Sequence, residues 1–367
     1  MTHVNGNENG NGYHPEPLRV LITGGAGFIG SHLGEWFIAR GATVTAVDDL
    51  STGRHSNIAH LEEHPGFRFV YESVLNETVM DRLVGECDVI FHLAAAVGVD
   101  LIIKRPVQTI ETNVLGTEAV LRLARRYHRK VVIASTSEVY GKSDNHPYEE
   151  GDDRLLGPTT RSRWAYAESK ALDEFLALAY YKEYRVPVVV VRLFNTVGPR
   201  QSGAYGMVIP RLVQQAVEGR PLTVYDDGKQ SRCFCDVRDV VRALADLVLT
   251  PAAEGEIFNV GSREEITILT LARRILELSG SASPIEFVPY ERAYDSDFED
   301  MRRRMPNLRK IRRFIGWEPR IPLDQTLREV IAEFRARAGI EATSDLPPPD
   351  SPDTTRSSAR VPVRTGS

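Results

Sequence analysis

The chain has 367 residues, with 45 basic and 50 acidic side chains and a formal net charge of −5. This mildly acidic balance argues against a general binder of nucleic acids or of anionic membranes, and no apolar run approaches the roughly 20 residues that a membrane helix needs. Hydrophobic residues make up 42 %, as in globular proteins, and three cysteines are too few for a disulfide framework, which favours a reducing compartment.

Both ends of the chain have the composition of disordered segments. Residues 1–17 are rich in Asn and Gly and lack the basic and apolar regions of a signal peptide. Residues 341–367 are rich in Pro, Ser and Thr, with too few large apolar side chains to offset the entropy lost on ordering. We therefore expect a cytoplasmic protein that folds over residues 18–340.

Short apolar runs alternate with longer amphipathic stretches up to about residue 200. The strand-like runs are Leu18–Thr23, Thr43–Asp48, Phe67–Glu72, Val89–Leu93, Lys130–Ser135 and Val186–Leu193. The helical patterns between them are His32–Arg40, Glu77–Val84, Thr109–Tyr127 and Trp164–Tyr184. This alternation predicts an α/β fold: a Rossmann-type doubly wound parallel sheet with helices on both faces.

Beyond residue 200 the alternation gives way to segments interrupted by Gly and Pro. Two helices are predicted there, Val208–Glu218 and Ile268–Ser279, together with a short strand, Glu286–Pro289. We therefore expect residues 18–200 to form most of the main domain. Residues 201–340 should supply most of a smaller C-terminal lobe that binds the substrate.

The first strand runs into a glycine-rich turn, GGAGFIG at residues 24–30, which is followed by a helix. In a nucleotide loop of this spacing, Gly24 permits the tight turn and Gly27 lets backbone N–H groups approach a pyrophosphate. Gly30 lets the helix pack on the strand. A purely structural turn gives the same letters. The following strand, however, ends at Asp48, where a carboxylate would accept hydrogen bonds from the adenosine ribose hydroxyls.

These features together favour dinucleotide binding over a structural turn. The Asp48 carboxylate would repel a 2′-phosphate, so NAD is favoured over NADP, whereas the nearby Arg54 would suit NADP.

A later helix carries Tyr166 and Lys170, four residues apart and therefore on one face. An ammonium beside the phenol would favour the phenolate and make Tyr166 a usable base near neutral pH. With 13 tyrosines in the chain, this spacing also arises by chance. Its position supports a function, because the preceding strand leads to the carboxyl edge of the sheet, where ligands bind. Three polar residues stand at the end of that strand: Thr136, Ser137 and Glu138.

Five motifs occur in a fixed order along the chain: GGAGFIG at 24–30, HLAA at 92–95, STSEVYG at 135–141, YAESK at 166–170 and RLFNTVGPR at 192–200. With them the chain resembles, over about residues 18–335, the extended short-chain dehydrogenase/reductases that act on nucleotide-diphosphate sugars. The resemblance implies a Rossmann domain with tightly bound NAD and a C-terminal lobe for the sugar nucleotide. It also implies a homodimer formed through the helices near 109–127 and 164–184.

The resemblance also implies roles for individual residues. Tyr166 would take the proton of the sugar O4 while the C4 hydride passes to NAD, Lys170 would favour the Tyr166 phenolate and hold the nicotinamide ribose, and Thr136 would hydrogen-bond O4. The further cofactor contacts would be Phe28, Ile29, Ala94 and Ala95, and the substrate diphosphate and nucleoside would be bound by Asn195 and Arg232. The chain departs from the family at residues 72–74 (Glu-Ser-Val), where many relatives carry an Asp against the adenine. This departure concerns the adenine contact and leaves the expected cofactor unchanged.

A 4-keto sugar can be re-reduced on its other face, lose water, or lose CO2 if C6 is a carboxylate. The last route needs little chemical help, because a 4-keto-uronate is a β-keto acid. The stretches around residues 135–141, 157–170, 229–239 and 303–319 resemble most closely the UDP-glucuronate decarboxylases. In that group the positions that fall on Ser137, Glu138 and Arg304 belong to the decarboxylation site.

Several alternatives remain open. Some relatives with the same Ser-Glu pair are 4-epimerases, so a UDP-sugar 4-epimerase acting on UDP-glucose or UDP-glucuronate is the main alternative, ahead of a 4,6-dehydratase. A non-catalytic NAD-binding scaffold would need the glycine loop and Asp48 but not Tyr166, Lys170 and Thr136, and the presence of all three favours an enzyme.

Two further patterns invite other interpretations. The basic run 302–313 could bind nucleic acid, but a single cluster in an acidic chain is more typical of a solvated helix face with a phosphate-binding Arg. Cys233 and Cys235 could bind a metal, but with no further Cys or His nearby they are better explained as small core residues, so no metal site is predicted.

Overall fold

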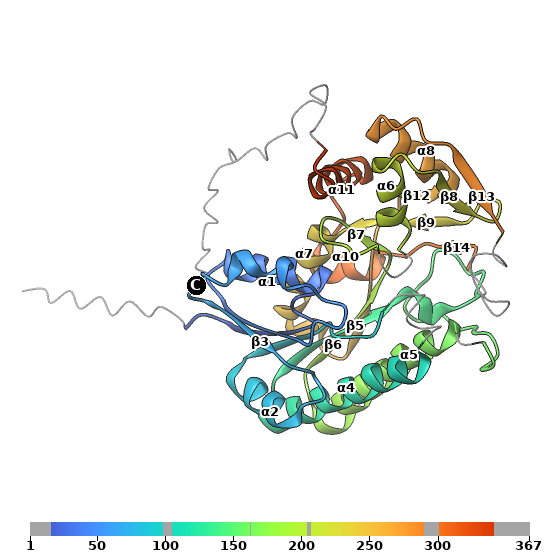
Figure 1. Ribbon diagram of the computed structural model, residues 1–367. Helices are drawn as coiled ribbons and strands as arrows, with labels where there is room; N and C mark the ends of the chain where they lie inside the picture. Colours follow the sequence, from blue (N-terminus) through green and yellow to red (C-terminus); the bar gives the residue numbers. More distant parts are fainter. Residues whose placement is uncertain (1–15, 98–104, 162, 204–206, 290–300, 341–367) are drawn as a thin grey trace, which may run out of the picture.

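A seven-stranded parallel sheet forms the centre of the molecule (Figure 1). The computed structural model describes residues 16–97, 105–161, 163–203, 207–289 and 301–340, so the tails expected to be disordered lie almost wholly outside the described residues. The strand order is β11-β6-β5-β4-β1-β2-β3. The strands are β1 (Arg19–Thr23), β2 (Thr43–Asp48), β3 (Phe67–Tyr71), β4 (Val89–His92), β5 (Lys130–Thr136), β6 (Val188–Leu193) and β11 (Glu256–Val260).

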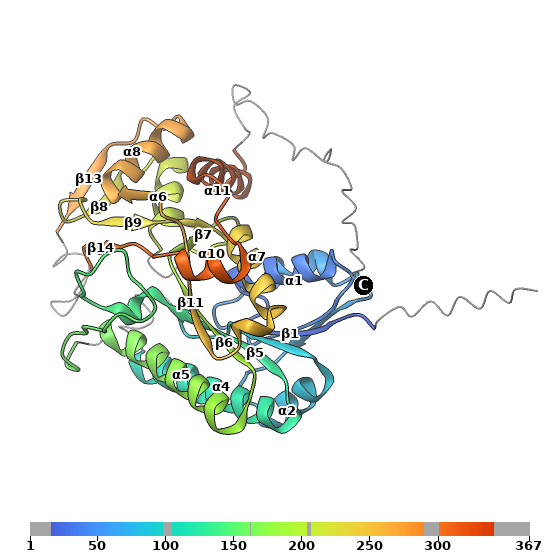
Figure 2. The same ribbon diagram turned by 180° about the vertical axis from the view of Figure 1, so that it is seen from behind.

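Helices cover both faces of this sheet (Figures 1 and 2). On one face lie α1 (Phe28–Ile38), α7 (Val237–Val248) and α10 (Arg309–Ile315), and on the other lie α2 (Glu77–Glu86), α4 (Pro106–Tyr127) and α5 (Arg163–Tyr184). Successive strand residues point to opposite faces, so Val20 and Ile22 join the first core whereas Leu21 joins the second. The predicted doubly wound α/β fold is confirmed.

A third core holds the smaller lobe together, beside α7 and α10 and across the molecule from α2 (Figure 2). Its helices are α6 (Val208–Val217), α8 (Ile268–Ser279) and α11 (Leu323–Arg337). Its strands are β8 (Leu222–Tyr225), β9 (Ser231–Cys233), β12 (Glu265–Thr267), β13 (Ile285–Val288) and β14 (Arg303–Arg304), and a short pair, β7 (Thr196–Val197) with β10 (Cys235–Asp236), lies next to them.

The structure corrects some element boundaries. Helix α1 begins at Phe28 rather than at His32, because the last residues of the glycine loop form its first turn, with Gly27 as the N-cap. Helices α7 and α11 were not predicted, although each buries an apolar stripe against its neighbours. Strand β11 belongs to the central sheet, although it comes from beyond residue 200.

Among the described residues, no helix combines the length and the apolar character that crossing a bilayer requires.

Candidate functional site

The glycine loop lies between the carboxyl end of β1 and the first turn of α1. Gly24 has φ +70°, and a Cβ added there would lie 2.8 Å from the backbone nitrogen of Ala94, which follows β4. A Cβ at Gly30 would collide with the carbonyl of Gly24. Only glycine fits these two positions, and its lack of a side chain lets the loop lie directly against the end of β4. Phe28 and Ile29 are the first two residues of α1. This is a cradle of the kind that binds a pyrophosphate at a helix N-terminus.

The Asp48 carboxylate, at the end of β2, connects this loop to the next one. One oxygen accepts the backbone N–H of Ala26 at 3.0 Å and the other accepts that of Leu50 at 2.8 Å. Burial raises the pKa of Asp48, and these two hydrogen bonds oppose the rise. The Arg54 guanidinium reaches Ser202 at 3.3 Å. Asp48 therefore holds the loop in shape while its carboxylate stands at the strand end where an adenosine ribose would lie.

Tyr166 and Lys170 lie on the buried face of α5, with exposed fractions of 7 % and 2 %. The Lys170 ammonium donates to the Asp173 carboxylate at 2.7 Å. The Ser169 hydroxyl donates to the backbone carbonyl of Tyr166, and the Asn113 amide of α4 donates to Ser169. The buried positions of Asp173 and Asn113 were missed by sequence reasoning, although Asp173 stands one helical turn after Lys170.

Thr136, Ser137 and Glu138 lie where β5 turns into a short 3-10 helix, Ser137–Tyr140. The Thr136 hydroxyl accepts the backbone N–H of Glu138 at 3.3 Å and so caps this turn. The Ser137 hydroxyl is buried, and it has no hydrogen-bond partner among the described residues. Two hydroxyls and a carboxylate are therefore gathered at the carboxyl edge of the sheet, one strand position away from β4.

Arg304 joins this edge to the smaller lobe. Its guanidinium lies 3.4 Å from the Glu138 carboxylate and donates to the Asn195 side-chain oxygen at 2.6 Å. The Asn195 amide in turn donates to the carbonyl of Cys233. Strand β14 pairs in parallel with β9, which places Arg304 opposite Arg232. The structure thus brings together Glu138, Asn195, Arg232 and Arg304, residues from four separate stretches of the chain.

The two alanines predicted to contact the cofactor and the two cysteines predicted to be core residues are the last residues to be placed. Ala94 and Ala95 follow β4, beside the glycine loop. Cys233 and Cys235 are both buried free thiols, and burial raises the pKa of Cys233 to about 12. A thiol of this kind stays protonated at neutral pH, as expected of a core residue.

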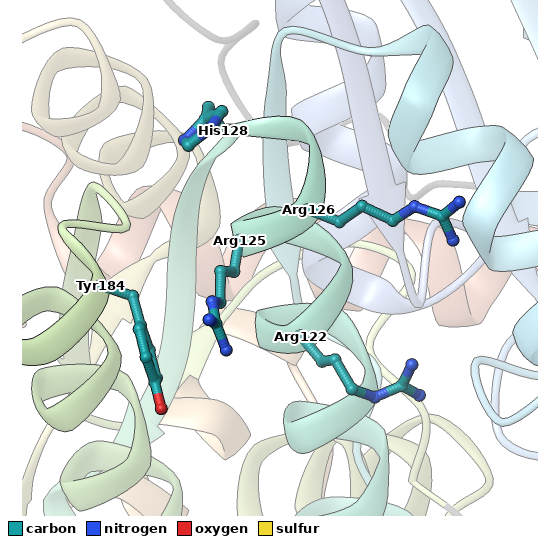
Figure 3. Close-up of a pocket in the computed structure, with 5 residues that line it drawn as sticks. All are labelled: Arg122, Arg125, Arg126, His128 and Tyr184. Atoms are coloured by element: carbon teal, nitrogen blue, oxygen red, sulfur yellow. The ribbon is translucent and has the colours of Figure 1, made fainter.

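A basic hollow lies at the other end of α4 and α5 (Figure 3). It is lined by Arg122, Arg125, Arg126, His128 and Tyr184. Tyr184 stands 18 residues after Tyr166 on one helix, which is about 27 Å at the rise of an α-helix. The Arg125 guanidinium stacks on the Tyr184 ring at 3.6 Å, and Arg122 and Arg126 pair with carboxylates of α2. This hollow is therefore separate from the site around Tyr166.

Comparison with known proteins relates this geometry to a family. The chain matches the family model described as GDP-mannose 4,6 dehydratase over residues 21–330. A UDP-N-acetyl-alpha-D-glucosaminuronate decarboxylase of Bacillus cytotoxicus is 43 % identical over 318 residues, covering 86 % of this chain and 98 % of the relative. UDP-glucuronic acid decarboxylase 1 of Xenopus tropicalis is 37 % identical over 337 residues, covering 91 % and 76 %.

A solved structure shares the fold with a different reaction in its name. UDP-glucuronic acid 4-epimerase from Bacillus cereus, in complex with UDP-glucuronic acid and NAD, superimposes with a TM-score of 0.77 at 27 % identity. The match covers 87 % of this chain and all of that one (100 %).

Proposed function

Because the chain belongs to the GDP-mannose 4,6-dehydratase family, we propose that it is an NAD-dependent enzyme that oxidises C4 of a UDP-linked uronic acid and releases CO2, most specifically a UDP-glucuronate decarboxylase. The observation that carries this proposal is the contact of Arg304 with Glu138 at the edge of the sheet that also holds Thr136. The two similar decarboxylases act, by their names, on uronic acids that differ at C2 and share a C6 carboxylate. A guanidinium at this place suits that shared group.

The residues around the glycine loop fit a dinucleotide. Gly24, Gly27 and Gly30 would let the pyrophosphate approach the backbone, and Asp48 would accept hydrogen bonds from the adenosine ribose. NAD supplies the hydride acceptor when bound. In this proposal residues 18–200 hold most of the cofactor site, and residues 201–340 contribute most of the sugar-nucleotide site through Arg232 and its neighbours.

The chain's own side chains would then carry the proton chemistry. Tyr166, as the phenolate, would take the proton of O4, with Thr136 holding that oxygen in place. Lys170 would favour the phenolate and hold the ribose next to it. The buried hydroxyl of Ser137, which lacks a partner among the described residues, would be free to hydrogen-bond the sugar.

Arg304 and Glu138 would act in the next step, the loss of CO2. A second carboxylate near the C6 carboxylate of the substrate opposes binding, and Arg304, in contact with Glu138, would offer one cation to both. When CO2 leaves, that repulsion ends, and Glu138 would guide the proton that replaces the carboxylate at C5. The 4-keto group serves as the electron sink.

A UDP-sugar 4-epimerase remains the second candidate, because the solved UDP-glucuronic acid 4-epimerase shares this fold over nearly the same length. The test is to incubate the full chain with NAD and UDP-glucuronate, its 2-acetamido analogue or UDP-glucose, and to follow product mass and C4 stereochemistry. We expect loss of CO2 from a uronate. A product of unchanged mass with C4 inverted would establish the epimerase. No turnover of any of the three nucleotide sugars would favour a non-catalytic NAD-binding scaffold instead.

Asp48 is expected to set the cofactor preference. In Asp48→Ala the ribose hydroxyls lose a charged acceptor, so NAD should bind about 10- to 100-fold more weakly and its advantage over NADP should narrow. Binding titrations of both dinucleotides measure this, with Asp49→Ala as the control, because Asp49 is exposed and only caps its own turn. Wild-type protein that bound NADP as tightly as NAD would contradict the assignment.

We further propose a homodimer formed through α4 and α5, which run side by side (Figures 1 and 2). Their outer surfaces expose several large apolar side chains, which a partner copy would cover. These are Val107, Ile110 and Leu115 on α4 and Leu172 and Phe175 on α5.

Phe175→Glu should shift this dimer toward the monomer, because the substitution places a charge in the centre of an apolar contact. Light scattering over a concentration series measures the change. Phe287→Glu is the matched control, since Phe287 is exposed on β13, away from both helices. A wild-type monomer, or a Phe175→Glu dimer as stable as the wild type, would contradict this interface.

A further inference from the structure

A row of buried polar side chains connects Lys170 to the strand ends beside the glycine loop. Lys170 donates to Asp173 at 2.7 Å. Burial raises the pKa of Asp173, and the nearby Lys170 ammonium and the Thr117 hydroxyl of α4 oppose the rise. The Thr117 hydroxyl lies 3.2 Å from Nε2 of His92, at the end of β4, and Nδ1 of His92 lies 2.9 Å from the hydroxyl of Thr23, at the end of β1. The five residues come from four elements, α5, α4, β4 and β1, and all five are buried.

The chemistry of these groups fixes which of them donates. Burial and the nearby Lys170 lower the pKa of His92 to about 3, so His92 is neutral and carries one N–H. The Thr23 oxygen accepts the backbone N–H of Ala94 at 3.2 Å, so we assign its hydroxyl proton to Nδ1 of His92. Nε2–H of His92 then donates to the Thr117 oxygen. The hydrogen bonds from Ala94 through Thr23 and His92 to Thr117 therefore all run in one direction, toward α4.

The charges around Lys170 leave Asp173 as its counter-ion. His92, facing it from β4, is neutral, and Thr117, facing it from α4, carries no charge. On α5 itself, Glu174 is held by Arg192 of β6 at 2.7 Å, so its charge is already balanced. Among the described residues, Asp173 is the carboxylate within ion-pair distance of the Lys170 ammonium. Its exposed side-chain fraction is 0 % and that of Lys170 is 2 %, so water does not screen the pair.

We propose that Asp173 is a positioning residue of the reaction, whose carboxylate keeps Lys170 charged and directed so that Lys170 can favour the phenolate of Tyr166. The inference rests on the proposed function. An ammonium taken out of water without a counter-ion tends to lose its proton. A neutral Lys170 could no longer stabilise a phenolate. One of the three N–H groups of Lys170 is used by Asp173, and two remain for the ribose and the phenol.

Asp173→Asn tests this role, because it keeps the shape and an acceptor oxygen but removes the charge. We expect half-ionisation of Tyr166 to move to higher pH by about one unit, which is about tenfold less phenolate at a given pH near neutrality. The acid limb of the pH profile of C4 oxidation should move in the same direction. The ultraviolet absorbance of tyrosinate, taken as the difference between each protein and the same protein carrying Tyr166→Phe, reports the ionisation without turnover.

Two further variants separate a charge effect from a structural one. Asp173→Glu restores the carboxylate and should return the Tyr166 titration toward that of the wild type. Asp239→Asn removes another buried carboxylate, paired with Arg242 on α7, and should lower stability without moving the titration. If Asp173→Asn does not fold, Thr117→Val, which removes a hydroxyl that lowers the pKa of the Asp173 carboxyl, should give a smaller shift in the same direction.

The outcomes distinguish this inference from the proposed function. A Tyr166 titration that stays in place in Asp173→Asn, moves to lower pH, or moves equally in Asp239→Asn overturns the role of Asp173. Absence of C4 oxidation in the wild-type protein with every nucleotide sugar overturns the proposed function instead, because the absorbance titration requires no substrate.

Discussion

Tyr166→Phe is expected to reduce C4 oxidation by roughly 10²–10⁴, the usual contribution of a positioned general base. The substitution removes one oxygen atom, and the phenyl ring occupies the same buried space on α5. The hydrogen bond from Ser169 to the backbone carbonyl of residue 166 is kept, so the helix should stay in place. Folding and NAD binding should therefore remain as in the wild type.

The measurement is a single-turnover experiment in which NADH absorbance follows the addition of UDP-glucuronate to the NAD-loaded protein. Tyr127→Phe is the control, because its hydroxyl donates to Asp81 at the far end of α4, and its rate should match the wild type. Oxidation by Tyr166→Phe at a rate comparable with the wild type would exclude Tyr166 as the base and leave the cofactor assignment standing.

Arg304→Ala is expected to slow CO2 release by about 100-fold or more, since truncating one partner of a largely buried charge pair typically costs this much. Without this cation, the C6 carboxylate of the substrate would no longer be held beside Glu138 in the orientation from which CO2 leaves. Asn195 also loses the donor that lies 2.6 Å away, so the loop after β6 loses one of its anchors. Glu138→Gln keeps the shape and removes the charge, and we expect it to impair the same step.

Both variants should impair CO2 release more than the initial C4 oxidation. In a rapid-mixing experiment, NADH should therefore form and persist while CO2 release lags behind. Arg303→Ala is a matched control: Arg303 neighbours Arg304 on β14, but it is exposed and pairs with Glu265. A wild-type protein that yields only C4-inverted product of unchanged mass would contradict the decarboxylase and favour the 4-epimerase.

The central fold could be predicted because each long element carries its own pattern. Strand β2 was predicted with its observed bounds, as was α8, and the other predicted strands of the sheet differ by one or two residues at their ends. Their short and nearly continuous apolar runs are visible in the local sequence alone. Helix α7 was missed because its first turn was interpreted as part of a binding motif. Its signal was present: Asp236 caps it, and apolar residues recur along one face.

The short strands could not be predicted in the same way. Strand β14 has two residues, too few for an alternating pattern, and its partner β9 lies about 70 positions earlier in the chain. The contact of Arg304 with Glu138 depends on this pairing. Resemblance assigned both residues to one site, whereas no local feature of the sequence places them within 3.4 Å.

The ion pair of Lys170 and Asp173 could be predicted only in part from the sequence. Three residues separate them on a helix, so their shared face follows from the sequence. Their burial does not, because it depends on α4 packing over α5 and on the end of β4, where Thr117 and His92 meet. A charged pair on a helix is ordinarily exposed to solvent, and only the packing distinguishes this one.

Strand β11 is synthesised long after β6, the strand with which it pairs, and this delay affects folding during synthesis. Residues Glu256–Val260 pair with β6, which ends at Leu193, so the ribosome must add more than sixty residues before this edge of the sheet can be closed. Until then β6 presents an unpaired, apolar edge of the kind that attracts other nascent chains. A shortened gene that stops near residue 200, where the strand-helix alternation ends, would leave that edge permanently open. Expression of residues 1–200 by themselves should therefore yield aggregated material, and chaperone demand during synthesis should peak in this interval.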